Sequence, residues 1–356
     1  MDALLDMAQA TVSLGVREMA CRLNAAAKSF AQAAQNLNRA AQVPMSRETL
    51  RQVVEEEGRR VQQAAAQEGL EAGWQAQDCR TESGPARVYV STDGFMVPLV
   101  TQAEKQARRK QVKQQRQKRG KKARPLGRIK KGADQRYKEF KAVTFYDQNL
   151  EHRLVSVTRG NCQELGCVMR RDAQRIGFYG AAERIGNIDG GPWARKQVQR
   201  RLKVTALGLD FYHLSENAHK ARRVLFGEED EAGKTVAGKW LHTVKHQGYE
   251  ALWEQLLQRR GVLRGPAKRR ALDQFMHYAA DRRDMIHYPE FLAKGWQIGS
   301  GPMESQCRVV PQRVKGPGKR WDADHAEAVM ALETLDQSNL WSGYWKLVHC
   351  HRMILG

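Results

Sequence analysis

Three acidic residues stand where a predicted strand ends or a predicted helix begins: Asp93, Asp189 and Glu304. Asp93 and Asp189 each end a short β-rich run and are each followed by glycine, which alone would also suit an ordinary turn. Glu304 follows the Gly-Ser-Gly-Pro run at 299–302, where serine or glycine can cap a helix with proline in its first turn. Carboxylates that meet at one edge of a sheet can hold a hard cation. This pattern, in a very basic protein, indicates a two-metal phosphoryl-transfer site.

A fourth acid, Asp210, also ends a predicted strand, so it is a rival for the second carboxylate. We favour Asp189 because it follows the fourth strand in chain order. His213 comes three residues after Asp210, and we expect it to orient that carboxylate or to cap the local helix. Zinc held by Asp210, His213 and His219 is an alternative, but that set lacks a fourth ligand at suitable spacing.

The positive charge of the chain is concentrated in one segment. The 356 residues contain 60 Lys and Arg against 39 Asp and Glu, a net charge of +21, and 14 of these cations lie at 104–131 beside one acid. Such a balance predicts a polyanionic partner, nucleic acid or an anionic membrane surface. We expect a mobile basic arm that contacts phosphates and, having no aromatic residue, does not stack on bases. Its predicted DNA-binding cations are Arg108, Arg109, Lys110, Lys118, Arg119, Lys121 and Lys122.

Several classes of protein are excluded by what the sequence lacks. The longest uncharged stretch near the start, at 7–16, is too short to span a bilayer, and no secretory signal is visible. The six cysteines are scattered without a CxxC pair, which is typical of reduced thiols in a cytoplasm.

The elements that would position the acids divide the chain into four parts. Residues 1–84 predict an all-α region in which Ser46 caps a helix with apolar residues on one face and arginines on the other. This outline fits a helix-turn-helix DNA reader, and the alternative is a packing or dimerisation hairpin. Residues 85–213 predict three antiparallel strands and then helix–strand–helix–strand, an α/β fold with a mixed sheet. Residues 214–295 predict a helical insertion, and residues 296–356 the C-terminal helices.

Four motifs in this order, with an Arg-Trp pair after them, resemble DDE-type transposases of bacterial insertion sequences, RNase H-like enzymes related to the Mutator group. The resemblance covers about residues 87–332, and the motifs are Ser91–Gly94, Ile188–Trp193, Leu209–His213 and Gly299–Ser305, followed by Arg320-Trp321. The second motif departs from the family, because relatives more often carry glycine before the acid and Gly-Ala after it.

The resemblance implies an RNase H-like core and a DNA transposase. Asp93, Asp189 and Glu304 would be the catalytic acids and would bind two Mg²⁺ ions, for which Mn²⁺ would substitute. Asp210 and His213 would match the family's acid-x-x-His signature, and Arg320 and Trp321 would contact DNA. The enzyme would cut at transposon ends and join the freed 3′-OH to target DNA. It would act on double-stranded DNA as a homodimer or higher oligomer, near the nucleoid and without a membrane.

Three other functions stay open from the residues alone. A structure-selective nuclease on the same fold would cut DNA without joining strands. A domesticated DNA-binding protein would have lost catalysis, although the presence of all three acids disfavours it. A basic RNA-associated protein would explain the charge but would leave the order of the acids to chance.

Overall fold

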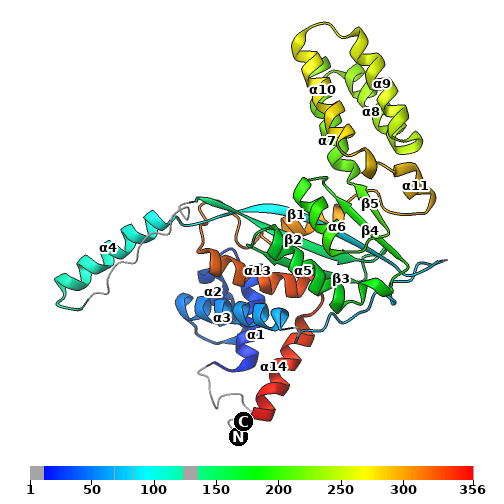
Figure 1. Cartoon of the computed structure of the whole chain (residues 1–356). Helices are drawn as coiled ribbons and strands as arrows, with labels where there is room; N and C mark the ends of the chain where they lie inside the picture. Colours follow the sequence, from blue (N-terminus) through cyan, green and yellow to red (C-terminus); the bar gives the residue numbers. More distant parts are fainter. Residues whose placement is uncertain (1–11, 68, 83, 123–134, 356) are drawn as a thin grey trace.

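The computed structural model describes residues 12–67, 69–82, 84–122 and 135–355. Its centre is a five-stranded sheet, with helices packed against it, and a single helix and a separate group of helices extend from it (Figure 1). The strands are β1 (Arg87–Pro98), β2 (Tyr137–Tyr146), β3 (Arg153–Thr158), β4 (Glu183–Ile188) and β5 (Ala206–Leu209).

The sheet is mixed, with the strand order β3-β2-β1-β4-β5. β1 pairs antiparallel with β2, and β2 with β3, because a short hairpin turn at 147–152 joins the latter two strands. β4 runs parallel to β1, and β5 parallel to β4. Parallel neighbours need crossover connections, and helices α5 (Cys162–Arg175) and α6 (Pro192–Arg201) provide them. The predicted mixed α/β sheet and its element order are confirmed.

One strand is longer than we expected. The sequence predicted that the first strand ends at Asp93, but β1 continues to Pro98 and Asp93 lies inside it. The reason is that β2 begins early and pairs with the whole extension, from Ala142 opposite Asp93 to Tyr137 opposite Pro98. The glycine after Asp93 therefore lies in a strand and not in a turn.

The N-terminal helices belong to the body of the protein. They are α1 (Leu14–Ala26), α2 (Phe30–Ala41) and α3 (Arg47–Ala66). Ser46 caps α3 as predicted, since its hydroxyl accepts the Thr49 N–H at 3.0 Å. The predicted apolar face is buried, and α3 lies so close to α13 (Ala323–Gln337) that a Cβ on Gly58 would stand 2.0 Å from the Ala328 carbonyl oxygen.

The basic face expected on α3 is largely neutralised by acids of the same helix. Arg51 pairs with Glu48 and Glu55, and Arg60 pairs with Glu56 and Glu57. The helices are confirmed, but a role in reading DNA stays a prediction.

Much of the basic segment between β1 and β2 is helical, and its mobility stays a prediction. Residues Gln102–Lys118 form the helix α4, which projects away from the sheet (Figure 1). Thr101 and Glu104 form a capping box at its start, and Gln, Lys, Arg and Ala are strong helix formers. No residue of α4 is buried, so local propensity and not packing determines its form. Residues 123–131 of the predicted arm lie outside the described residues.

The predicted helical insertion is present and extends from the β5 end of the sheet (Figure 1). It consists of α7 (Phe211–Phe226), α8 (Glu231–Gln247), α9 (Tyr249–Val262), α10 (Pro266–Ala280) and α11 (Tyr288–Ala293). The chain then returns to the sheet through α12 (Gly301–Val309), α13 and α14 (Trp341–Leu355). In the described part of the chain, no helix is long and apolar enough to cross a membrane.

Candidate active site

Strand register brings two of the predicted acids to the same level of the sheet. Each paired residue of β1 lies opposite the β4 residue 96 positions later, as Val90 does opposite Gly186. Asp189 stands 96 positions after Asp93, so it follows β4 at the level of Asp93. Tyr89 and Ile185 belong to one hydrophobic cluster on one face of the sheet. Each acid comes four residues after one of them, and side chains alternate between the faces along a strand, so both acids are expected on that same face. Pairing of β1 with β4 therefore directs the two carboxylates to a common location.

The carboxyl group of Asp93 is in an unfavourable environment for a negative charge. Burial raises the pKa of Asp93, and the charge of Asp189 raises it further, while the Gly94 N–H and the charge of His213 oppose the shift. The Gly94 N–H donates to Oδ1 at 2.6 Å, and the thiol of Cys307 donates to Oδ2 at 3.7 Å. The effect of Asp189 on this pKa shows that the two carboxylates interact electrostatically.

Helix α12 lies over β1 and β2 and carries the third predicted acid. As predicted, Ser300 is its N-cap residue, Pro302 lies in its first turn, and Glu304 follows there. Glu304 is one turn before Cys307, so both side chains lie on one face of α12. The side chain of Glu304 is 69% exposed and pairs with Arg308 at 3.3 Å. Glu304 is thus on the correct helix, but its carboxylate points towards solvent.

The three acids do not form a compact ligand cluster. Within residues 12–67, 69–82, 84–122 and 135–355, no set of ligand atoms from Asp93, Asp189 and Glu304 lies within 4.8 Å of one another. The same holds in the described residues for Asp210, His213 and His219, the alternative zinc set. The charge of Asp189 raises the pKa of Asp93, as expected for two like charges near each other.

Asp210 is level with Asp189 across β4 and β5, but its carboxylate is already occupied. It is the N-cap of α7, accepting the Tyr212 N–H at 2.6 Å and the His213 N–H at 3.3 Å. Its other oxygen accepts the Ser300 N–H at 2.7 Å and the Ser300 hydroxyl. With 3% of its surface exposed, Asp210 joins the start of the insertion to the start of α12.

His213 does not orient Asp210 through its ring. Only its backbone N–H contacts that carboxylate, and ring Nδ1 lies 3.9 Å from Glu216 on the next turn of α7. The charge of His213 lowers the pKa of Asp93.

Side chains of the insertion enclose the turn that carries Asp189. The Tyr278 hydroxyl donates to the Asp189 backbone carbonyl at 3.2 Å, and the Arg282 guanidinium stacks 4.0 Å from the Tyr278 ring. Gly190 has φ +76° and faces Arg282, so no side chain fits there. The Gly191 N–H donates to the Asp189 carboxylate at 2.8 Å. Sequence reasoning missed Cys307, Tyr278 and Arg282, and only the spacing between Glu304 and Cys307 could have signalled one of them.

The predicted DNA-binding cations fall into two groups. The seven in and after α4 are exposed and make no ion pair within the described residues. Arg320 instead binds the Leu99 carbonyl at 3.0 and 3.1 Å and pairs with Glu104. Trp321 continues this attachment, because its backbone bonds to β1 at Pro98 and its ring meets Phe30 edge to face. Arg320 and Trp321 therefore connect the C-terminal helices to β1.

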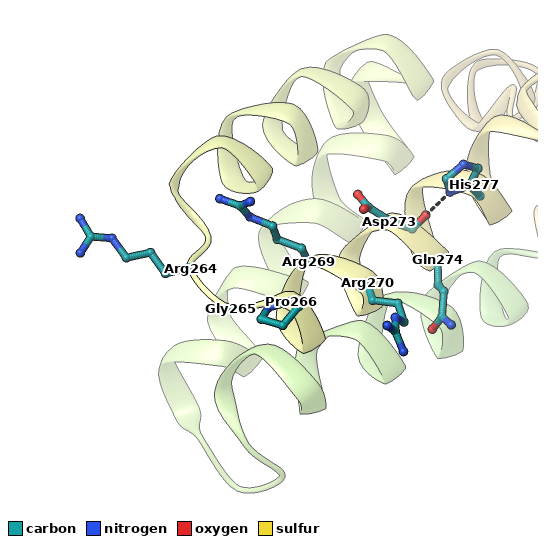
Figure 2. A pocket seen from close by; sticks show the side chains of 8 residues that line it. All are labelled: Arg264, Gly265, Pro266, Arg269, Arg270, Asp273, Gln274 and His277. Carbon is teal, nitrogen blue, oxygen red and sulfur yellow. Dashed lines mark hydrogen bonds between the residues drawn. The ribbon is translucent and has the colours of Figure 1, made fainter.

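A further basic hollow lies on the insertion, away from the acids. Figure 2 shows Arg264 extending from the loop before α10 and Arg269 and Arg270 pointing to different sides of the helix. The lining residues are Arg264, Gly265, Pro266, Arg269, Arg270, Asp273, Gln274 and His277. Asp273 is neutralised by Arg260 of α9, so the hollow is positively charged overall.

Comparison with known proteins gives limited matches. Residues 1–143, less than half of the chain, match the uncharacterised protein family UPF0236. No curated protein matches the sequence. The solved structure of the Drosophila P element transposase strand transfer complex is similar over 95% of this chain and 81% of that one, at 10% identity. Its TM-score is 0.29, which does not establish a shared fold.

Proposed function

We propose that this protein is a metal-dependent DNA transposase of the DDE type, with an RNase H-like core. The observation that carries the proposal is the register of β1 and β4, which brings Asp93 level with Asp189 beneath the helix of Glu304. Three antiparallel strands followed by two parallel ones, with Asp93 in β1 and Asp189 directly after the adjacent β4, agree with such a core.

The residues present fit a divalent cation. The donor set consists of carboxylate oxygens, which hard cations such as Mg²⁺ prefer. Burial and the charge of Asp189 raise the pKa of Asp93 although the charge of His213 opposes them, and a bound cation would favour the ionised carboxylate. Asp93, Asp189 and Glu304 would hold two Mg²⁺ ions, with Mn²⁺ as a substitute. When bound, the metal would supply an activated water and stabilise the leaving 3′ oxygen.

The chain's own side chains support this chemistry in three ways. The Cys307 thiol donates to one oxygen of Asp93 and the Gly94 N–H to the other, which together hold the carboxylate in place. Tyr278 and Gly191 hold the turn of Asp189 from both sides. Asp210 fixes the beginning of α12, and hence the position of Glu304, through its bonds to Ser300. Asp210 is a positioning residue in this scheme, and Asp189 is the second catalytic acid.

The exposed cations of α4 support double-stranded DNA as the partner. Arg108, Arg109, Lys110 and Lys118 lie on a helix with no buried residue, where each can reach a phosphate oxygen. Arg119, Lys121 and Lys122 continue the charge beyond the helix. Because transposition joins two ends, we propose a homodimer or higher oligomer on the DNA, acting near the nucleoid.

Strand transfer of a pre-cut oligonucleotide into supercoiled plasmid tests the proposal. The oligonucleotide comes from the DNA flanking the gene, and the assay contains Mg²⁺ or Mn²⁺. We expect metal-dependent joining that is lost in Asp93→Asn, Asp189→Asn and Glu304→Gln. Glu254→Gln is the matched control, because Glu254 is an exposed acid of the insertion.

The outcomes separate the alternatives. Metal-dependent nicking without joining would indicate a nuclease. Tight DNA binding without either reaction would indicate a domesticated DNA-binding protein, and unchanged joining in Asp93→Asn would refute the assigned site.

A further inference from the structure

A cluster of metal-ligating side chains lies just beyond the end of β2, away from Asp93, which pairs with the middle of that strand. Cys79, Asp147 and His152 each offer a ligand atom, and these three atoms lie within 4.8 Å of one another. Among the described residues, this is the one set of three such groups that comes so close. Asp147 is five residues beyond Ala142, the partner of Asp93, so the cluster is about 17 Å along the strand from the candidate active site.

The three ligands come from segments that the fold brings together. Asp147 follows β2 and His152 precedes β3, so both belong to the hairpin turn. Cys79 lies in the segment that leads from the N-terminal helices to β1, and its carbonyl accepts the Arg87 N–H at 2.8 Å. A metal ion here would join this segment to the hairpin.

The three ligand atoms are close enough together to share one metal ion. His152 Nδ1 lies 3.0 Å from Asp147 Oδ2. Ligand atoms about 2.0–2.2 Å from zinc in a tetrahedron are about 3.3–3.6 Å apart, so small shifts would accommodate the ion. Cys79 and Asp147 are buried and His152 is partly exposed, which leaves an approach from solvent. The thiol of Cys79 makes one weak contact, with the Gln75 carbonyl at 3.9 Å, and can turn away from it.

We propose that Cys79, Asp147 and His152 bind one Zn²⁺ ion as its three protein ligands. One sulfur, one nitrogen and one oxygen donor suit zinc, whereas Mg²⁺ and Ca²⁺ prefer oxygen alone. Water completes the fourth position. The Trp74 ring, 5.5 Å from the His152 ring, covers one side of the site. The site is independent of the proposed transposase chemistry, because it shares no residue with it.

Metal analysis of the untagged full-length protein tests the proposal. After incubation with Zn²⁺ and dialysis, we expect about one zinc per chain and a higher unfolding temperature than for chelator-treated protein. Co²⁺ substitution should produce a thiolate-to-cobalt charge-transfer band. Cys79→Ser and His152→Ala should lose the zinc, the band and the temperature shift, whereas Cys167→Ser, which changes an exposed free cysteine, should keep all three.

Two results would overturn the proposal. If native protein retains no zinc and shows no charge-transfer band, the Asp147–His152 contact is only a hydrogen bond of the hairpin. If Cys79→Ser and His152→Ala retain as much zinc as native protein, the ion binds elsewhere. Circular dichroism of the two variants identifies a general loss of folding, and the cobalt spectrum of native protein decides the matter without any variant.

Discussion

Replacing Asp210 with alanine should destabilise the protein, whereas the same change at Asp189 should leave stability nearly unaltered. Both acids follow neighbouring strands at the same level of the sheet, so they form a matched pair. Asp210 accepts hydrogen bonds from Tyr212, His213 and Ser300, while the carboxylate of Asp189 accepts one from Gly191. The difference in these partners predicts the difference in stability.

The expected loss of stability in Asp210→Ala has two sources, because Asp210 caps α7 and also accepts the Ser300 N–H. Removing an N-cap side chain costs about 1 kcal/mol of stability. Leaving a buried N–H donor such as that of Ser300 unsatisfied costs about 1–3 kcal/mol more. We therefore expect Asp210→Ala to lower the free energy of unfolding by about 2–4 kcal/mol. Asp189→Ala should change it by less than about 1 kcal/mol, because that carboxylate has fewer bonds to lose.

Urea denaturation followed by tryptophan fluorescence measures both values. Ser300→Ala and the double variant complete a thermodynamic cycle, in which we expect a coupling of about 0.5–3 kcal/mol between Asp210 and Ser300. Equal stability of Asp210→Ala and Asp189→Ala would refute the reasoning. So would loss of strand transfer in Asp210→Ala at a temperature where its fold is intact, combined with full activity of Asp189→Ala.

Three further predictions concern packing, DNA binding and pH. Gly58→Ala should lower the unfolding temperature at a cost of about 1–3 kcal/mol, since its Cβ would meet the Ala328 backbone, whereas Gly238→Ala, with open space around it, should not. Changing the cations at 108–110 to glutamine should make DNA binding less dependent on salt, as measured by fluorescence anisotropy. The slope of log binding constant against log salt concentration should become shallower by about 0.9 for each lost phosphate contact. An unchanged slope would contradict a role of α4. Burial raises the pKa of Asp93 in the folded protein above its value in the unfolded chain. Above this raised pKa the ionised carboxylate therefore destabilises the folded state, and the destabilisation disappears as the pH falls through it. Asp93→Asn should therefore unfold at a higher temperature than native protein at pH 7, with an advantage that shrinks on acidification; an advantage that grows would have the wrong sign.

Much of the fold could be predicted because its signals are local. The capping serine at 46, the apolar face of α3 and the Gly-Pro start of α12 each act over a few neighbouring residues. Alternating β-rich runs indicated the five strands and their order along the chain. The helical form of the basic segment was not predicted, because its charge suggested mobility while its capping box and helix formers produce α4.

The candidate site could be predicted only in part. The three acids and Asp210 could be identified as candidates from their motifs. The Asp210 carboxylate accepts a hydrogen bond from Ser300, which lies 90 residues later in the chain. The Asp189 carboxylate accepts one from its near neighbour Gly191. A partner as distant as Ser300 could not be inferred from the sequence around Asp210. The assignments of Arg320 and Trp321 to DNA met the same difficulty, because their partners near Leu99 lie more than 200 residues away.

By itself, the amino-acid sequence determined the types of the elements, the net charge and the identity of the acidic motifs. These properties depend on side-chain chemistry and on interactions between near neighbours. The tertiary structure alone decided that Asp93 and Asp189 lie at the same height of the sheet and that the Asp210 carboxylate is hydrogen-bonded to the start of α12. It also decided that Cys79 lies close to Asp147 and His152. Each of these depends on strand register or on contact between distant segments, and a shift of one residue in register would turn the side chains to the other face.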